Sequence, residues 1–309
     1  MNNFNFVALE QISIFFTMND FDFVEFERIY NVIDKKFLIW FIGFSAGDGS
    51  WIVRHKKKRI LFQIGQKEKE ILLYIKDTLG FGIVRSYDAK TRLNKLDRIY
   101  YQFVVEKKQH VLFLIALFNG NLCLNKTQKR FYQWINNYQL FYGHKTNFKI
   151  KKVKVNLNSP WLSGFTDAEG CFYARLTKPT LKRKVEIQRG FSLSQSEKEI
   201  VLFIRDVILQ EIGIKAKSPT YLITENNAYE ISSFRLNISD RKQLLIVINY
   251  FTRYALKTKK RISFERWVYF VNEKNLINRY TSQNALLKLK TLVLAVQNHN
   301  IMFEPLNLP

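Results

Sequence analysis

The sequence has few cysteines, few acidic residues and no long apolar run. Its two cysteines, Cys123 and Cys171, are too few for a disulfide framework or a zinc site, which suits a reducing compartment. No apolar run approaches the roughly 18 residues that a membrane-spanning helix needs. The acidic N-terminus lacks the basic flank of a signal peptide. The four histidines are scattered and form no metal or general-base cluster. These absences argue against a disulfide-rich secreted domain, a membrane protein and a histidine-based enzyme.

Positive charge is abundant. The chain has 49 Lys and Arg against 26 Asp and Glu, a net charge of +23, and residues 1–36 are themselves acidic, so the excess lies downstream. With 47% apolar and 15% aromatic residues the chain is expected to fold rather than form a disordered basic tail. A folded domain of this charge most plausibly binds a polyanion, with nucleic acid ahead of a membrane surface.

The chain nearly repeats itself. The stretch WFIGFSAGDGSW (Trp40 to Trp51) aligns with PWLSGFTDAEGCF (Pro160 to Phe172) at an offset of 121 residues. Two further pairs of stretches match in the same order. The first pair is FQIGQKEKEILLYIKDTLGFG and FSLSQSEKEIVLFIRDVILQEIG, and the second is NKTQKRFYQW and LKTKKRISFERW. Three correspondences in the same order indicate a duplication with two related half-domains.

Each copy predicts a mixed α+β unit with the order αββαββαα. The chain is divided into an N-terminal extension (1–36), two half-domains (37–142 and 160–270), a basic linker (143–159) between them, and a tail with one helix (271–309). Expected strands of the second copy lie near residues 172–177, 184–195, 217–221 and 230–237. Its later helices are expected near residues 197–212, 240–250 and 259–273.

The repeated stretch combines small residues with an acid. Gly43 and Gly47 lie four residues apart, as do Gly164 and Ala168, so each pair shares one helix face. Small residues there allow two helices to pack until their backbones nearly touch. Asp48 and Glu169 would then meet at two negative helix ends, where a divalent cation would relieve their repulsion. Oxygen ligands beside phosphate suit Mg²⁺.

These residues carry a resemblance. FIGFSAGDG and LSGFTDAEG resemble the nine-residue motif of the LAGLIDADG homing endonucleases, of the intron-encoded, single-chain type with two repeats. The first copy has Ser45 and Ala46 where an Asp-like residue is usual. The resemblance implies two pseudo-symmetric half-domains packed through their motif helices, with their sheets forming a saddle over DNA. It also implies a monomer that hydrolyses both strands of a long, nearly palindromic DNA site, using two or more divalent metal ions.

The resemblance also assigns active-site residues. It implies that the acids Asp48 and Glu169 bind metal, with help from the Gly47 and Ala168 carbonyls. Six positions are expected to be catalytic: Asp48, Glu169, Gln66, Gln195, Lys129 and Lys260. The glutamines match a position that holds water, and the lysines match basic residues near the scissile phosphates. Lys126 and Lys259 are adjacent alternatives. The family often has a basic residue one helical turn after each glutamine, but this sequence has Glu70 and Glu199 there.

Strand alternation assigns the side chains that face DNA. Those expected from the first half are Ser50, Ile52, Arg54, Lys56, Arg59, Gln63, Arg85, Tyr87, Arg98, Tyr100 and Gln102. Those expected from the second half are Tyr173, Arg175, Thr177, Lys184, Gln188, Ser192, Ser233, Arg235 and Asn237. Arg and Gln can pair bidentately with base edges, whereas most Lys contact phosphate.

Two other functions stay open at this stage. One is a maturase that binds its own intron RNA, and the other is a DNA-binding protein of the same fold that does not cut. Retention of both acids favours cleavage over the second. We expect an intracellular protein without a membrane partner, in a mitochondrion or another organelle.

Overall fold

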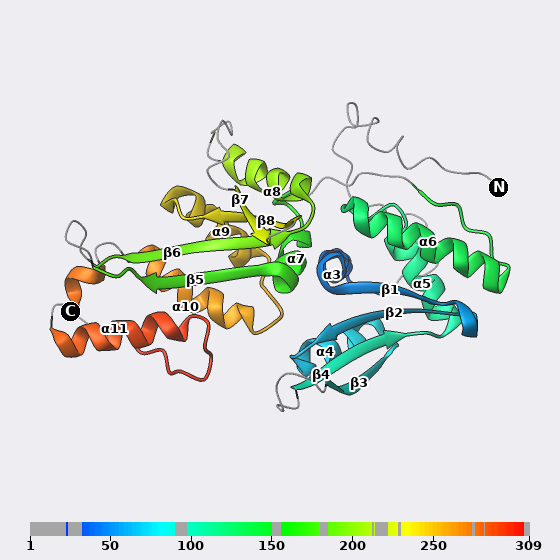
Figure 1. Cartoon of the computed structure of the whole chain (residues 1–309), viewed down its shortest axis with the longest axis horizontal. Helices are drawn as coiled ribbons and strands as arrows, with labels where there is room; N and C mark the ends of the chain where they lie inside the picture. The colour runs from blue at the N-terminus through cyan, green and yellow to red at the C-terminus, as the bar shows by residue number, and fades with distance from the viewer. Residues whose placement is uncertain are drawn as a thin grey trace.

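The computed structural model describes residues 23, 33–89, 98–149, 156–179, 185–211, 213, 222–227, 230–273, 276–280 and 282–305. Within them the predicted order αββαββαα occurs twice, which confirms the α+β class and the pseudo-symmetric halves. The two halves lie side by side and meet at their motif helices, and their strands run outward in opposite directions (Figure 1).

The first half begins with the motif helix and continues directly into the first strand. Its elements are α3 (Lys35–Asp48), β1 (Gly49–Arg54), η1 (His55–Lys57), β2 (Arg59–Gln66), α4 (Lys69–Leu79), β3 (Ile83–Ala89), β4 (Arg98–Val105), α5 (Lys108–Phe118) and α6 (Asn125–Tyr142). The sheet is antiparallel with strand order β1-β2-β4-β3.

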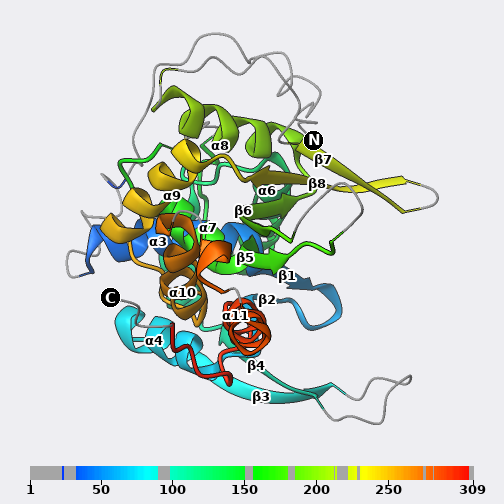
Figure 2. The ribbon, with the colours of Figure 1, turned by 90° about the vertical axis from the view of Figure 1, so that its left-hand side faces the viewer.

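The second half repeats this arrangement and adds a tail. Its elements are α7 (Trp161–Glu169), β5 (Gly170–Leu176), β6 (Ile187–Gln195), α8 (Lys198–Gln210), β7 (Leu222–Asn227), β8 (Glu230–Ile238), α9 (Arg241–Arg253) and α10 (Lys260–Asn272), followed by η3 (Leu276–Arg279) and α11 (Gln283–Ala295). The strand order β5-β6-β8-β7 is equivalent to that of the first sheet. Viewed from the side, β7 and β8 lie above the central strands β1, β2 and β5, and β3 and β4 lie below them (Figure 2).

Burial patterns explain why these segments adopt these elements. In α4 the buried residues Ile71, Leu72, Ile75 and Leu79 recur at helical spacing, and Gly80 ends the helix with a φ of 75°. The motif helix α3 differs, because almost its whole second half is buried and apolar. A helix that is apolar on all sides belongs inside the molecule, which places α3 at the centre.

The two motif helices pack backbone to backbone. A Cβ atom built on Gly43 would lie 2.1 Å from the Trp161 carbonyl oxygen, and one built on Gly164 would lie 1.9 Å from that of Trp40. Neither distance leaves room for a methyl group, and the neighbour in each case is main chain, which cannot move aside. The predicted packing through small residues is therefore confirmed.

Several boundaries differ from expectation. Helix α3 begins at Lys35, where Asp34 caps it by accepting from the Lys36 N–H at 3.0 Å, so two residues assigned to the extension belong to the motif helix. A strand was expected near residues 217–221, which lie outside the described residues, and β7 is found at Leu222–Asn227. The predicted tail helix is α11, which packs along the edge strand β5. No helix in the described part of the chain is long and apolar enough to cross a bilayer.

Candidate functional site

The ends of α3 and α7 bring two carboxylates together. A Cβ atom on Gly47 would lie 2.4 Å from the Ala168 Cβ and 3.0 Å from the Glu169 Cγ, so the last turns of the two helices touch. Each helix passes into a strand without a loop, because Gly49 and Gly170 have extended backbones. Asp48 and Glu169 consequently lie at the centre of the molecule, between the two sheets.

Burial and proximity perturb both acids. Burial, and after it the negative charge of Glu169, raise the pKa of Asp48 from 3.8 to about 7, against the opposing effects of Lys260 and Gln66. Burial likewise raises the pKa of Glu169, while Lys260 opposes the shift. Two carboxyl groups with raised pKa values at adjoining helix ends form an anionic site that favours protons or cations. Such perturbed groups mark candidate functional sites.

A lysine from the second half reaches this centre. The Lys260 ammonium donates to the carbonyl oxygens of Ala168 at 2.8 Å and Thr166 at 3.1 Å. Burial lowers its pKa, and the charges of Asp167, Asp48 and Glu169 act in the opposite direction. Because Ala168 already accepts from Lys260, its carbonyl can bind a metal ion only if the ammonium shares that oxygen or moves.

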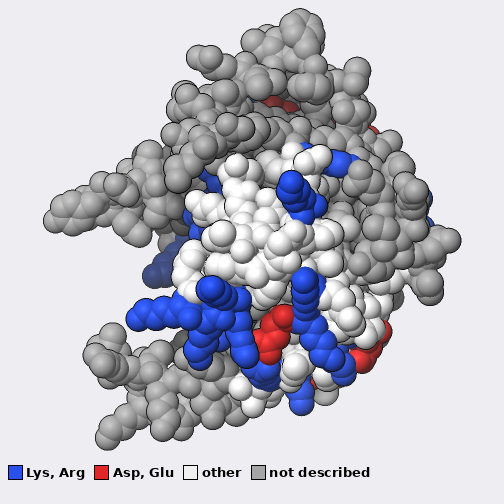
Figure 3. Space-filling model, turned by 90° about the vertical axis from the view of Figure 1, so that its right-hand side faces the viewer, with Lys and Arg blue, Asp and Glu red and all other residues white. Residues whose placement is uncertain are grey.

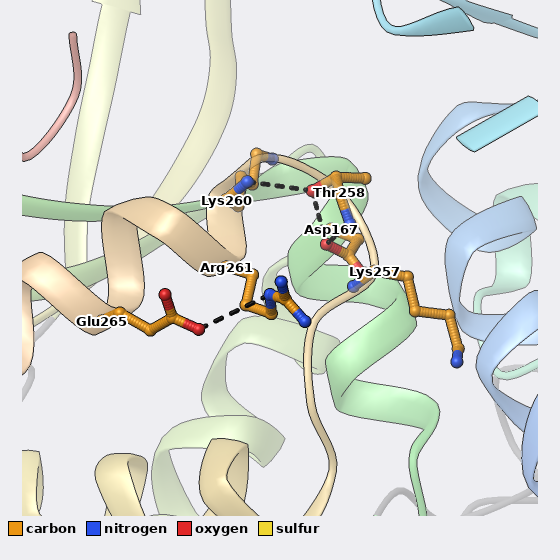
Figure 4. A network of polar contacts seen from close by, with 6 residues as sticks. All are labelled: Asp167, Lys257, Thr258, Lys260, Arg261 and Glu265. Atoms are coloured by element: carbon orange, nitrogen blue, oxygen red, sulfur yellow. Dashed lines mark hydrogen bonds and ion pairs between the residues drawn. The ribbon is translucent and has the colours of Figure 1, made fainter. Parts of the chain in front are cut away.

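The buried acid Asp167 holds the segment that delivers Lys260. Its carboxylate accepts from the Trp40 indole N–H at 2.9 Å, and from the backbone N–H groups of Lys257 at 2.9 Å and Thr258 at 3.1 Å. The Thr258 hydroxyl donates a fourth bond at 2.5 Å (Figure 4). Three of these four bonds fasten the chain just before α10, whose first residue is Lys260, and the fourth joins Asp167 to α3.

Two glutamates join the halves beside this centre. Glu197 accepts from the backbone N–H groups of Asn125 and Lys126, at the start of α6, at 2.8 Å each. Glu68 accepts from the Lys259 N–H, at the start of α10, at 2.9 Å. Each glutamate thus contacts a helix N-terminus of the opposite half, where a negative charge is favourable. Sequence reasoning missed them, although QKEKE and QSEKE place both at the same distance from the predicted glutamines.

The predicted glutamines differ in their surroundings. Gln66 donates its side-chain N–H to the Asp48 carboxylate, a direct contact with the acid, whereas the expected role of this position is to hold water. The side-chain oxygen of Gln195 instead accepts from the backbone and hydroxyl of Ser196. No hydrogen bond joins Gln195 to Glu169 among the described side chains. Lys129, the counterpart of Lys260, lies within α6 and has an exposed side chain. The catalytic roles of these residues stay predictions.

Strand pairing places the predicted DNA-facing residues of each sheet on one face. In the first half Ser50 pairs with Gln63, Arg54 with Arg59, and Arg85 with Gln102. Their neighbours Trp51 and Phe62 are buried on the other face. Tyr100 shares the outer face, whereas Lys56 lies in the turn η1 rather than in a strand. The side chains of Tyr87 and Arg98 lie outside the described residues.

The second sheet has the same alternation. Arg175 pairs with Gln188 and Ser192 with Asn237, and these residues share a face with Tyr173 and Arg235. Several are already joined there: Tyr173 donates to Asn237 at 2.8 Å, and Arg175 to Gln188 at 2.8 Å. Thr177 follows β5 and accepts from the Glu186 N–H at 2.8 Å. Lys184 and the Ser233 side chain lie outside the described residues. A recess of about 360 Å³ opens among Tyr173, Arg175, Gln188 and Asn237.

Basic side chains gather at the outer end of the first sheet. Residues 54–59, which connect β1 to β2, are exposed and include Arg54, three consecutive lysines and Arg59. Figure 3 views this end of the molecule and shows lysine and arginine side chains clustered over a limited region, with few acidic ones. Such a cluster suits phosphate contacts more than base contacts.

The central donors fit a metal ion that prefers oxygen. The described residues contain no group of three or more His, Cys, Asp or Glu side chains suited to a metal. What they offer is two carboxylates and the neighbouring main-chain oxygens of Gly47 and Ala168. Mg²⁺ commonly uses one or two carboxylates and takes its remaining ligands from water and substrate phosphate. Two buried, mutually repelling acids therefore fit such an ion.

Comparisons with known proteins agree with this geometry. A family model described as LAGLIDADG endonuclease matches residues 41–138 and 162–271, one match in each half. The chain is 31% identical over 231 residues to "Probable intron-encoded endonuclease 4" of Neurospora crassa, a match that covers 74% of this chain and only 38% of that longer protein. It is 27% identical over 271 residues to "Probable intron-encoded endonuclease aI3" of Dictyostelium citrinum, covering 80% of this chain and 99% of the relative.

Solved structures share the fold. The LAGLIDADG meganuclease I-AabMI bound to uncleaved DNA has a TM-score of 0.59 at 17% identity, over 84% of this chain and 99% of that one. I-SmaMI, bound to an uncleaved DNA target in the presence of calcium ions, has a TM-score of 0.56 at 14% identity, over 84% and 98%. With a repeated family match, paired motif helices and a shared two-sheet fold, the chain belongs to the LAGLIDADG endonuclease family.

Proposed function

We propose that the chain is a site-specific DNA homing endonuclease that hydrolyses both strands of a long, nearly palindromic target. The observation that carries this proposal is the meeting of Asp48 and Glu169 at the ends of α3 and α7. Neither helix gains from an acid at its negative end, and burial makes the ionised pair costly. A chain that keeps both acids there is best explained if a cation and a phosphate complete the site.

Each group in the centre has a role that its contacts support. A divalent ion, which we take to be Mg²⁺, would be held by Asp48 and Glu169 and would supply charge stabilisation and an activated water at the phosphate. Gln66 orients the Asp48 carboxylate. Lys260 places positive charge beside both acids, where it can stabilise charge that develops on a scissile phosphate.

The outer faces of the sheets support DNA as the partner. Strand pairing puts the Arg, Gln, Asn and Tyr side chains of each sheet on one face of that sheet, and a basic turn follows at residues 54–59. We propose that these side chains contact bases while the lysines contact phosphate. Because one chain contains both halves, it would act as a monomer. Intron-encoded relatives support a mitochondrial or other organellar location.

Cleavage of the DNA that flanks its own insertion point tests the proposal. A plasmid carrying that junction should be linearised with Mg²⁺, and the Asp48→Asn variant should bind the same DNA without cutting it. Binding without cutting by the wild-type chain would support a non-cleaving DNA-binding protein. Preferential binding of the intron RNA, with no binding to the junction, would support a maturase.

A further inference from the structure

Asp167 binds the segment that precedes Lys260, and its counterpart in the first half, Ala46, has no polar side chain with which to do the same. By accepting from Lys257 and Thr258 it holds that segment outside the helix, and α10 starts at Lys260. The Lys260 ammonium is thereby directed at the Ala168 and Thr166 carbonyls. Asp167 is only 2% exposed, so its carboxylate is not presented to solvent.

The repeat places Ala46 at the position of Asp167. In the first half the equivalent helix, α6, begins earlier, at Asn125. Lys129 is therefore one full turn inside the helix and exposed, whereas its counterpart Lys260 begins its own helix. Because Ala46 has no carboxylate, position 46 cannot make the bonds by which Asp167 holds the segment before Lys260.

A second observation concerns the residues that would serve a carboxylate at position 46. Trp40, which donates to Asp167, corresponds in the repeat to Trp161. The Trp161 side chain is fully buried, and its indole N–H has no hydrogen-bond partner among the described residues. Thr127, the counterpart of Thr258, is also buried. An indole donor without an acceptor is what the loss of a carboxylate at position 46 would leave behind.

We propose that Asp167 is a positioning residue for Lys260, and that Ala46 makes the two catalytic halves unequal, so that one DNA strand is cut faster than the other. This inference rests on the proposed nuclease function. In each strand, water adds across a phosphodiester P–O bond to give a phosphate monoester and an alcohol. The chemistry of the two strands is identical, so a difference in rate has to come from the surrounding groups.

The expected imbalance is large enough to measure. Removing one well-placed group that stabilises developing charge typically slows a reaction by about 10² to 10³-fold. Nicked duplex should therefore accumulate before the linear product. Asp167→Asn should slow the faster strand toward the rate of the slower one without weakening DNA binding. Thr258→Val, which removes one of the four bonds, should act in the same direction with a smaller effect.

The first experiment needs neither metal nor DNA. The free protein is treated with an amine-acylating reagent, and modification of each lysine is followed by mass spectrometry. We expect Lys260 to react slowly compared with its exposed neighbour Lys259, and Lys129 to react readily. In Asp167→Asn and Thr258→Val, Lys260 should become reactive while Lys259 is unchanged. Equal reactivity of Lys260 in wild type and both variants would overturn its positioning by Asp167.

The second experiment resolves the two strands. Duplex target labelled on either strand is cut with Mg²⁺, and each rate is measured separately. Ala46→Asp, which gives Trp161 an acceptor, should raise the slower rate. Equal rates for the two wild-type strands would refute the inference. If neither strand is cut, the proposed function fails instead, and the positioning role is decided by the acylation pattern alone.

Discussion

Replacing Asp48 with Asn should stabilise the free protein at alkaline pH. In the folded chain, burial and Glu169 hold the pKa of Asp48 at about 7, against 3.8 in the unfolded chain. Between these values the folded protein keeps a proton that the unfolded chain has released. The free energy of unfolding therefore falls as pH rises from about 4 to about 7, and is constant above that range.

The size of the effect follows from the shift. At about 1.4 kcal/mol per pKa unit, holding Asp48 ionised at pH 8 costs roughly 4 kcal/mol, and at pH 5 the cost is roughly 1.5 kcal/mol. The wild-type chain should thus lose about 2.5 kcal/mol between pH 5 and pH 8 through this one group. Asparagine has the shape of the protonated acid and no charge. The free energy of unfolding of Asp48→Asn should therefore lack the loss of about 2.5 kcal/mol between pH 5 and pH 8 that Asp48 causes.

Denaturant unfolding in the presence of a chelator measures this directly. Wild type and Asp48→Asn are compared at pH 5 and pH 8, with Asp77→Asn as a control, since Asp77 is an exposed carboxylate on α4. The stability gained by Asp48→Asn should be larger at pH 8 than at pH 5, and the control should show no such trend. If wild type and Asp48→Asn have parallel pH profiles, the two acids are not crowded, and the argument for a cation between them is lost.

Other predictions follow from the same contacts. Gly43→Ala should cost about 3 kcal/mol or more, because its methyl group meets the Trp161 carbonyl, whereas Gly65→Ala, with no atom within 4 Å, should be nearly neutral; a normal melting temperature for Gly43→Ala would contradict the helix packing. Glu197→Ala should lose about 2 kcal/mol of stability through its two bonds to α6, while the exposed Glu199 serves as the matched control in denaturant melts. DNA affinity in gel shifts should fall by about a thousandfold between about 50 and 200 mM salt, and a flat response would remove nucleic acid as the partner. Glu169→Gln should slow both strands together by orders of magnitude in a plasmid digest while DNA binding survives, and normal cutting would refute the metal site.

The features that could be predicted are those repeated in the sequence. Gly43 and Gly164 recur at equivalent positions with the same helical spacing, so their close packing follows from two copies of one pattern. The faces of β1 follow from counting in twos from Asp48 as far as Arg54, because the helix runs into its strand without an intervening loop, but the next position, Lys56, lies in η1. In these cases a local rule determines the result, and the structure agrees with it.

The features that could not be predicted depend on contacts between distant segments. KTQKR and KTKKR look equivalent, yet α6 begins four residues before Lys129 whereas α10 begins at Lys260. The difference arises from hydrogen bonds between Thr258 and Asp167, which lie 91 residues apart. No local propensity encodes such a contact. The only visible signal was the departure at Ala46 from the motif, and the sequence did not show what that position contacts.

The motif contains two kinds of acid: the last one, Asp48 or Glu169, and the inner one, which only the second copy has, as Asp167. Asp48 and Glu169 lie at one shared centre, where the charge of Glu169 raises the pKa of Asp48, so we expect the loss of either acid to disturb the chemistry of both strands. Asp167 acts on a segment of its own half, and losing its counterpart at position 46 affects one half only. A single-chain protein can therefore tolerate Ala46 while it keeps both metal-binding acids. The Trp161 indole N–H, which has no hydrogen-bond partner among the described residues, fits the loss of an acceptor at position 46. At the centre that both halves share, both copies keep an acid, Asp48 and Glu169. At the position that serves one half only, the second copy has Asp167 and the first has Ala46.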